Sequence, residues 1–122
     1  MLRSLRTNEQ GTAAVEFAIV GPIFLSLTVG MIYVCMLMFS MASMQYAVEE
    51  GARCASVKTT VCTSNAVTVT HTQNAYFGPV ISPTFTSTTA ACGHQVHGTA
   101  TFTLNTGLRT ISVPLVANSC FP

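Results

Sequence analysis

A run of 32 residues without a charged side chain, from Phe17 to Val48, limits this chain more than any other feature. An α-helix rises about 1.5 Å per residue, so about 20 residues cross a hydrocarbon core about 30 Å thick. Apolar residues occur on all sides of the predicted helix, as lipid requires, rather than on one stripe. Charged residues make up only 7% of the chain, and its mean hydropathy is +0.51. We therefore expect one membrane-spanning helix.

The predicted helix begins near residue 12 and continues past the membrane to about residue 58. Residues 41–58 are rich in Ala and Met and carry charged side chains on a solvent-facing side. Pro22 lies inside the helix and removes one backbone hydrogen bond. It predicts a local kink or loosened turn between Ala18 and Pro22, which membrane helices tolerate.

The rest of the chain, after Lys58, is rich in Thr and interrupted by Pro and Gly. Residues 64–76 have the length of a short helix that Ser64 or Asn65 can cap, although their Val and Thr content gives weaker support for a strand. Three later segments have strand-like patterns, with Asn105-Thr106-Gly107 as the turn between the last two. These segments are Thr84–Thr88, His94–Leu104 and Leu108–Ala117.

The predicted fold class is α+β. A long N-terminal transmembrane helix, about 12–58, leads into a small extracytoplasmic domain with a short helix and a three-stranded antiparallel β-meander. Every second residue of the two longer strands is expected to face this helix, with Val96 and Phe102 in one strand and Val113 and Leu115 in the next. The expected division of the chain is 1–11 as a polar, basic leader, 12–48 as the transmembrane helix, 49–63 as its extracytoplasmic extension and 64–122 as a disulfide-linked β domain.

Four of the five cysteines follow the apolar run and predict two disulfides in an oxidising compartment. A hairpin centred on Thr106 places Cys92 opposite Cys120, at a Cα distance of about 4.5–5.5 Å that suits a disulfide. The remaining pair, Cys54 and Cys62, would close a short loop at the end of the helix. We therefore predict the bonds Cys54–Cys62 and Cys92–Cys120 over the other two connectivities. Cys35, at membrane depth, is expected to be a small apolar packing residue.

Glu16 is a single carboxylate at the start of the apolar run, five residues after Gly11. A glutamate in lipid costs a few kcal/mol and is a functional candidate that needs a partner. The alternative is an interfacial residue that the helix dipole favours.

The segment QGTAAVEFAIVGPIFL, together with EEGARCAS and the terminal CFP, resembles the TadE-like minor pilins, or pseudopilins, of tight-adherence (type IVc) pilus systems. In type IV prepilins a short basic leader ends in Gly and is removed by a membrane-embedded peptidase, and the fifth mature residue is Glu followed by Phe. The resemblance therefore implies a prepilin leader at residues 1–11, cleavage between Gly11 and Thr12, and an assembly role for Glu16 and Phe17. The resemblance is strong over the N-terminal helix and looser over the tail.

The function that this resemblance implies is assembly of a type IVc pilus, through priming, capping or export. The implied partners are other pilin or pseudopilin subunits bound through the N-terminal helix, the prepilin peptidase and the inner-membrane assembly platform. Arg3 and Arg6 predict a cytoplasmic N-terminus and a periplasmic C-terminus in the bacterial inner membrane. The alternative is an anchored or secreted periplasmic binding domain that is not processed as a pilin.

Small residues predict close contacts between helices in lipid. They recur at spacings of four or eight along two stripes of the helix. The lower stripe is Ala14, Ala18, Ser26 and Gly30, and the upper stripe is Ser43, Ala47, Gly51 and Ala55.

Other function classes find no support in the sequence. The tail after Lys58 has no Asp or Glu, so we expect no enzyme and no cofactor. His94 and His97 would face opposite sides of a strand, and together with His71 they make a poor metal site. The net charge of +1 gives no basic patch for a nucleic acid.

Overall fold

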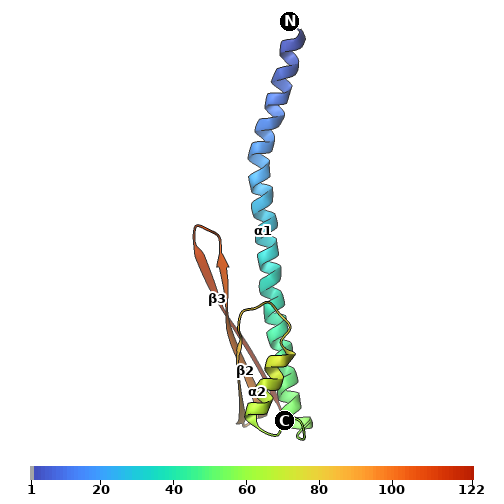
Figure 1. Cartoon of the computed structure of the whole chain (residues 1–122), viewed down its shortest axis with the longest axis vertical. Coiled ribbons are helices and arrows are strands. Elements are labelled where there is room, and N and C mark those ends of the chain that lie inside the picture. Colours follow the sequence, from blue (N-terminus) through green and yellow to red (C-terminus); the bar gives the residue numbers. More distant parts are fainter. Residues whose placement is uncertain (1) are drawn as a thin grey trace. The chain divides into compact units, whose positions relative to one another are not determined.

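The computed structural model describes the backbone of residues 2–122 and the side chains of residues 11–122. The predicted α+β fold is confirmed, and its elements follow the expected order (Figure 1). They form two compact units, Met1–Cys35 and Met36–Pro122. The elements are α1 (Leu2–Val57), α2 (Asn65–Ala75), β1 (Thr84–Ala90), β2 (Gly93–Asn105) and β3 (Thr110–Phe121).

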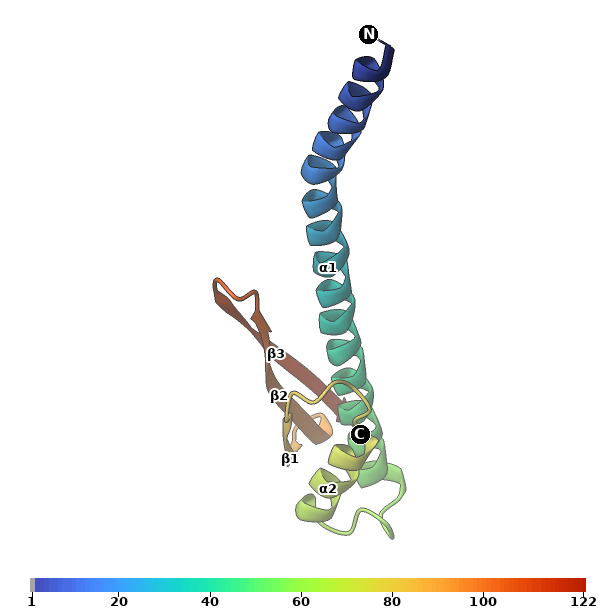
Figure 2. The ribbon, with the colours of Figure 1, turned by 45° about the horizontal axis from the view of Figure 1, so that its top comes forward.

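Helix α1 has 56 residues and begins about ten residues earlier than the sequence predicts. The residues before Gly11 include Leu, Arg, Glu and Gln, which are good helix formers, so the helix extends back through them. The helix runs through Pro22 without interruption, and both ribbon views show a bend in the blue part of α1 (Figures 1 and 2). It ends at Val57, so the predicted helical extension over 49–63 is too long by six residues, which form the turn and loop that Cys62 closes.

The first unit contains the apolar part of α1, which is exposed. Between Gly11 and Cys35 every residue is exposed except Gly21, which is half-buried. The described part of this helix is long and apolar enough to cross a membrane. Its exposed residues include Phe17, Leu27 and Met31, which lose contact with water only if lipid or another chain covers them.

The second unit begins inside the segment that the sequence assigns to the membrane. Met44, Ala47, Val48 and Ala52 of α1 are buried against the inner face of the sheet. Residues 36–48 therefore contribute to a protein core rather than facing lipid on all sides. The 19 residues from Phe17 to Cys35 still rise about 28 Å, close to the thickness of a bilayer core.

The sheet is antiparallel with the strand order β1-β2-β3. The predicted inner face is confirmed, since Val96, Phe102 and Leu115 are buried and Gly98 pairs with Ala117. Strand β1 pairs only with residues 93–99 of β2, so the rest of the β2–β3 hairpin has two strands. Strand β3 forms one edge of the sheet, and Pro114 lies in the middle of that edge.

The predicted register of the hairpin is wrong. Cys120 lies opposite Gln95, which places the centre of the hairpin between Gly107 and Leu108 rather than at Thr106. The loop between β2 and β3 is longer than expected because hydrogen bonds to the Asn105 and Thr106 side chains stabilise it. The Gly107 N–H donates to Asn105 Oδ1 (2.9 Å) and Arg109 N–H donates to Thr106 Oγ1 (3.1 Å). Gly107 also adopts a φ of 80°, which glycine accepts without strain.

Helix α2 confirms the predicted short helix and packs against α1. The Ser64 side chain caps its N-terminus by accepting a hydrogen bond from Val67 N–H (3.4 Å). A Cβ atom added at Gly51 of α1 would lie 3.2 Å from Thr72 Cβ and closer still to Thr72 Oγ1. That hydroxyl donates to the Thr68 carbonyl (2.8 Å), so it is not free to turn away. The close approach of the two helices therefore requires glycine at position 51.

Replacing Gly51 with Ala tests this contact. The substitution gains about 1 kcal/mol of helix propensity. Overpacking against Thr72 costs about 1–3 kcal/mol. We expect a net loss of about 1 kcal/mol in the free energy of unfolding, measured by urea unfolding in detergent micelles with circular dichroism as the signal.

The matched control is Gly30→Ala in the same helix. A Cβ atom at Gly30 meets nothing within 4 Å, so this variant should be as stable as the natural chain or slightly more stable. Equal stability of the two variants would show that α1 and α2 do not meet at Gly51.

Candidate assembly and processing site

The residues predicted for processing and assembly lie on the exposed N-terminal part of α1. Gly11, Thr12, Glu16 and Phe17 are all exposed, and a side chain at Gly11 would meet nothing within 4 Å. They occupy less than two turns of helix, so a partner can reach all four together.

Phe17 lies at one end of a concave apolar surface on this helix. Its side chain is 79% exposed, and its ring lies 3.8 Å from the position of a Cβ atom at Gly21. Gly21 and Pro22 project less from the helix than their larger neighbours, so the surface is recessed at these two residues. The surface is lined by Phe17, Ala18, Gly21, Pro22, Phe24 and Leu25.

Glu16 has no cationic partner among the side chains of residues 11–122. Both ion pairs found there belong to Glu50, which contacts Lys58 (3.1 Å) and His71 (3.8 Å). Glu16 therefore presents an exposed carboxylate directly before the apolar run, at the residue where the sequence predicts a charge partner from outside the chain.

Two hydroxyl groups farther along this helix are bonded within the helix. Ser26 Oγ donates to the Ile23 carbonyl (2.8 Å) and Thr28 Oγ1 donates to the Phe24 carbonyl (2.9 Å). Hydroxyls bonded to their own helix can face lipid or another helix without an unsatisfied donor. Glu16 is the charged group at the start of this stretch, and a charge in lipid needs a partner.

The two stripes of small residues have different surroundings. Ala14, Ala18, Ser26 and Gly30 are exposed, as a contact surface between helices requires. The upper stripe is buried under α2 and the sheet of the same chain, because Ser43 and Ala47 are fully buried and Thr72 covers Gly51. The prediction that the upper stripe packs against other helices in lipid is therefore wrong.

Residues 11–53 match the family model described as TadE-like protein. The N-terminal helix of this chain is TadE-like. The match begins at Gly11 and ends at Arg53, so α2 and the sheet lie beyond it. It supports the resemblance read from the residues and indicates involvement in tight-adherence pilus systems. No curated protein and no solved structure matches the chain.

Both disulfides of the structure lie outside the TadE-like segment. Cys54 is bonded to Cys62, with Cα atoms 5.8 Å apart, and Cys92 to Cys120, with Cα atoms 6.2 Å apart. These are the predicted pairs, although Cys92 lies in the turn before β2 and not opposite Cys120 in the ladder. Cys35 is an exposed free thiol, so within the chain it does not pack as predicted.

Removing either disulfide tests its share of the stability of the compact unit. Loop entropy predicts a loss of about 2.5 kcal/mol for Cys54→Ala/Cys62→Ala and about 3.6 kcal/mol for Cys92→Ala/Cys120→Ala. The difference follows from sequence separations of 8 and 28 residues. Urea unfolding in detergent measures both losses, with Cys35→Ala as the control that leaves the two bonds in place. A larger loss for the shorter loop would contradict the entropic account.

Proposed function

We propose that the chain is a minor pilin or pseudopilin that takes part in the assembly of a tight-adherence (type IVc) pilus, through priming, capping or export. One observation carries this proposal. A TadE-like helix presents a lone, exposed carboxylate, Glu16, directly before an uncharged and exposed apolar surface. A surface of this kind needs cover by lipid and by partner helices.

Processing at the Gly11–Thr12 bond is the first step of the proposed function. A prepilin peptidase hydrolyses this bond and removes residues 1–11. The exposure of both residues and the start of the family match at Gly11 support this position. Cleavage leaves an α-amino group on Thr12, whose ordinary pKa of about 7.7–8.0 makes it mostly positive at neutral pH.

The new amine of one subunit and Glu16 of its neighbour then fix the axial register between the two subunits. Within one chain, four residues separate them, which is about 6 Å along a helix axis. A neighbouring subunit displaced by about this distance places its amine beside Glu16. In lipid the paired charges are far less costly than either charge alone. The pair therefore favours one axial offset between subunits over all others.

The lower stripe of small residues supplies the close approach that such a pair requires. Ala14 and Ala18 flank Glu16 and lie one turn apart, so a partner helix can come near the carboxylate. Small side chains let helix backbones approach closely, and the gain comes from van der Waals contact rather than from the hydrophobic effect.

The proposed orientation places the N-terminus in the cytoplasm and the compact unit in the periplasm. Arg3 and Arg6, whose side chains lie outside the described ones, satisfy the positive-inside rule by sequence. Two disulfides in Met36–Pro122 fit an oxidising compartment on the far side. The proposed partners are the prepilin peptidase, other pilin-like subunits and the inner-membrane assembly platform.

The mature N-terminus tests the processing step. Mass spectrometry of the protein from cells with an active prepilin peptidase should give Thr12 as the first residue, and cells without the peptidase should retain residues 1–11. Retention of Met1 in both strains would indicate a plain membrane anchor. A start beyond about residue 40 would indicate secretion after removal of a signal peptide.

Replacing Glu16 with Ala tests the register role. The variant should insert into the membrane and lose its leader, but its recovery in the assembled pilus fraction should fall at least about tenfold because the amine of the neighbour is left unpaired in lipid. Glu49→Ala is the matched control, since it removes an exposed carboxylate of the same helix from the compact unit. Normal recovery of the Glu16→Ala variant would refute the charge pairing.

A further inference from the structure

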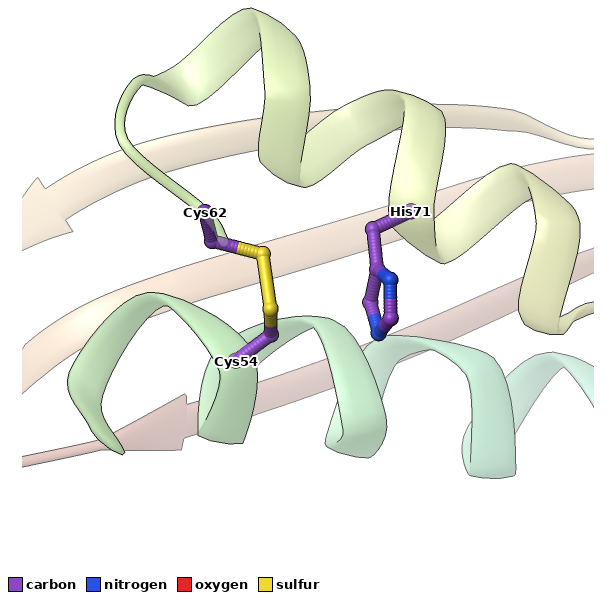
Figure 3. A group of neighbouring side chains, drawn as sticks. All are labelled: Cys54, Cys62 and His71. Atoms are coloured by element: carbon purple, nitrogen blue, oxygen red, sulfur yellow. A yellow bond between two sulfur atoms is a disulfide. The ribbon is translucent and has the colours of Figure 1, made fainter. Parts of the chain in front are cut away.

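A cluster of three ligand-type side chains lies in the compact unit, where the end of α1 meets α2. His71 points from α2 toward the Cys54–Cys62 disulfide, with Cys54 on α1 and Cys62 on the loop between the helices (Figure 3). A ring nitrogen of His71 and the two Sγ atoms all lie within 4.8 Å of one another. Three separate segments of the chain therefore converge on one point.

The imidazole of His71 faces this point without a hydrogen-bond partner. Its Nε2 atom is buried, and it makes no hydrogen bond within the described part of the chain. The nearest carboxylate oxygen, Glu50 Oε1, is 3.8 Å away, which is too long for a hydrogen bond. Buried polar atoms normally have partners, so this nitrogen calls for an explanation.

Glu50 completes the surroundings of the cluster. It lies one helical turn before Cys54, and its carboxylate accepts a hydrogen bond from Lys58 Nζ (3.1 Å). The Lys58 ammonium thus forms an ion pair with this carboxylate. Two sulfurs and one imidazole nitrogen thus lie within 4.8 Å of one another, and a carboxylate oxygen lies 3.8 Å from His71 Nε2.

We propose that the dithiol form of the chain binds Zn²⁺ through Cys54, Cys62 and His71, with Glu50 as the fourth ligand. Zinc prefers four tetrahedral ligands of these types, with Zn–S bonds of about 2.3 Å and Zn–N bonds of about 2.0–2.1 Å. Neighbouring ligand atoms are then about 3.5–3.8 Å apart. Zinc binding therefore requires the two sulfurs to separate and the His71 nitrogen to move toward them.

Protons and charges balance when the proposed site binds zinc and when it is oxidised. When Zn²⁺ binds, each thiol releases one proton and forms one Zn–S bond. The two thiolates and the Glu50 carboxylate give the zinc complex a net charge of −1, and the Lys58 ammonium beside Glu50 offsets it. Oxidation by a disulfide compound then forms the Cys54–Cys62 bond, breaks both Zn–S bonds and frees Zn²⁺, while the oxidant takes up two protons and becomes two thiols.

Zinc in the dithiol form and the disulfide in the oxidised form are thus alternative links between Cys54 and Cys62. Either one holds the end of α1 to the start of α2, eight residues apart in sequence. Before oxidation, zinc keeps Cys54 and Cys62 together and away from Cys92 and Cys120. The site therefore directs the correct pairing of four cysteines, and it does so independently of the proposed role in pilus assembly.

Cobalt substitution tests the site in the full chain, held in detergent micelles. A variant with Cys35→Ser, Cys92→Ser and Cys120→Ser keeps only the two cluster thiols, and circular dichroism checks that it is folded. After reduction with a phosphine, it should bind one equivalent of Co²⁺ with sulfur-to-metal charge-transfer and tetrahedral d–d bands, and Zn²⁺ should displace the Co²⁺. The oxidised variant should show no such bands.

Matched substitutions identify the ligands. His71→Ala should weaken zinc binding at least about tenfold, whereas His97→Ala should leave it unchanged because that imidazole lies outside the cluster. Glu50→Gln should weaken binding and Glu49→Gln should not. Absence of cobalt bands in the reduced, folded chain, or equal affinity of the His71→Ala variant, would overturn the proposal. If the triple variant does not fold, the reduced natural chain carries the same comparison of His71→Ala with His97→Ala.

Discussion

The packing of the compact unit depends on one face of α1, which is formed by Ser43, Ala47, Gly51 and Ala55. Each side chain is small and each is buried, so α2 and the sheet come close to the helix backbone. Thr72 packs on Gly51, and Phe85 closes over Gly98 on the sheet side. A single larger residue on this face would hold the layers apart and reduce the buried area on which a small domain depends.

The same helix also has to satisfy a second environment. From Phe17 to Cys35 its side chains are exposed and apolar, while from Ser40 onward one side is buried in protein. The amino-acid pattern differs little between the two parts, since both combine small and apolar residues. What separates them is the presence of a folded partner in the same chain, which α2 and the sheet provide only for the second part.

Much of the architecture could be predicted because its signals are local. An uncharged run of 32 residues predicts a long apolar helix, and Ser64 predicts the cap of a short one. The alternation of Val96, Gly98 and Phe102 identifies the inner face of a strand. The register could not be predicted, because the Asn105 and Thr106 side chains lengthen the loop. The disulfides were predicted correctly from an incorrect register, since Cys92 lies in a turn outside the ladder.

The candidate sites divide in the same way. Gly11 and Glu16 lie within one short motif, so sequence alone identifies them. From the sequence alone, His71 is considered as a metal ligand only together with His94 and His97. The structure places it beside Cys54 and Cys62. No spacing along the chain indicates this neighbourhood, because it depends on how α2 rests on α1. The two stripes of small residues show the same limit of sequence patterns, since similar spacing occurs on an exposed surface and in a core.

Pro114 has a consequence for the open edge of the sheet. An open sheet edge exposes unpaired backbone groups that invite a strand from another molecule. Pro114 lies midway along the edge strand β3 and has no N–H to offer, so an added strand would find a gap in its ladder. Pairing of this edge with a strand of another molecule is thereby disfavoured.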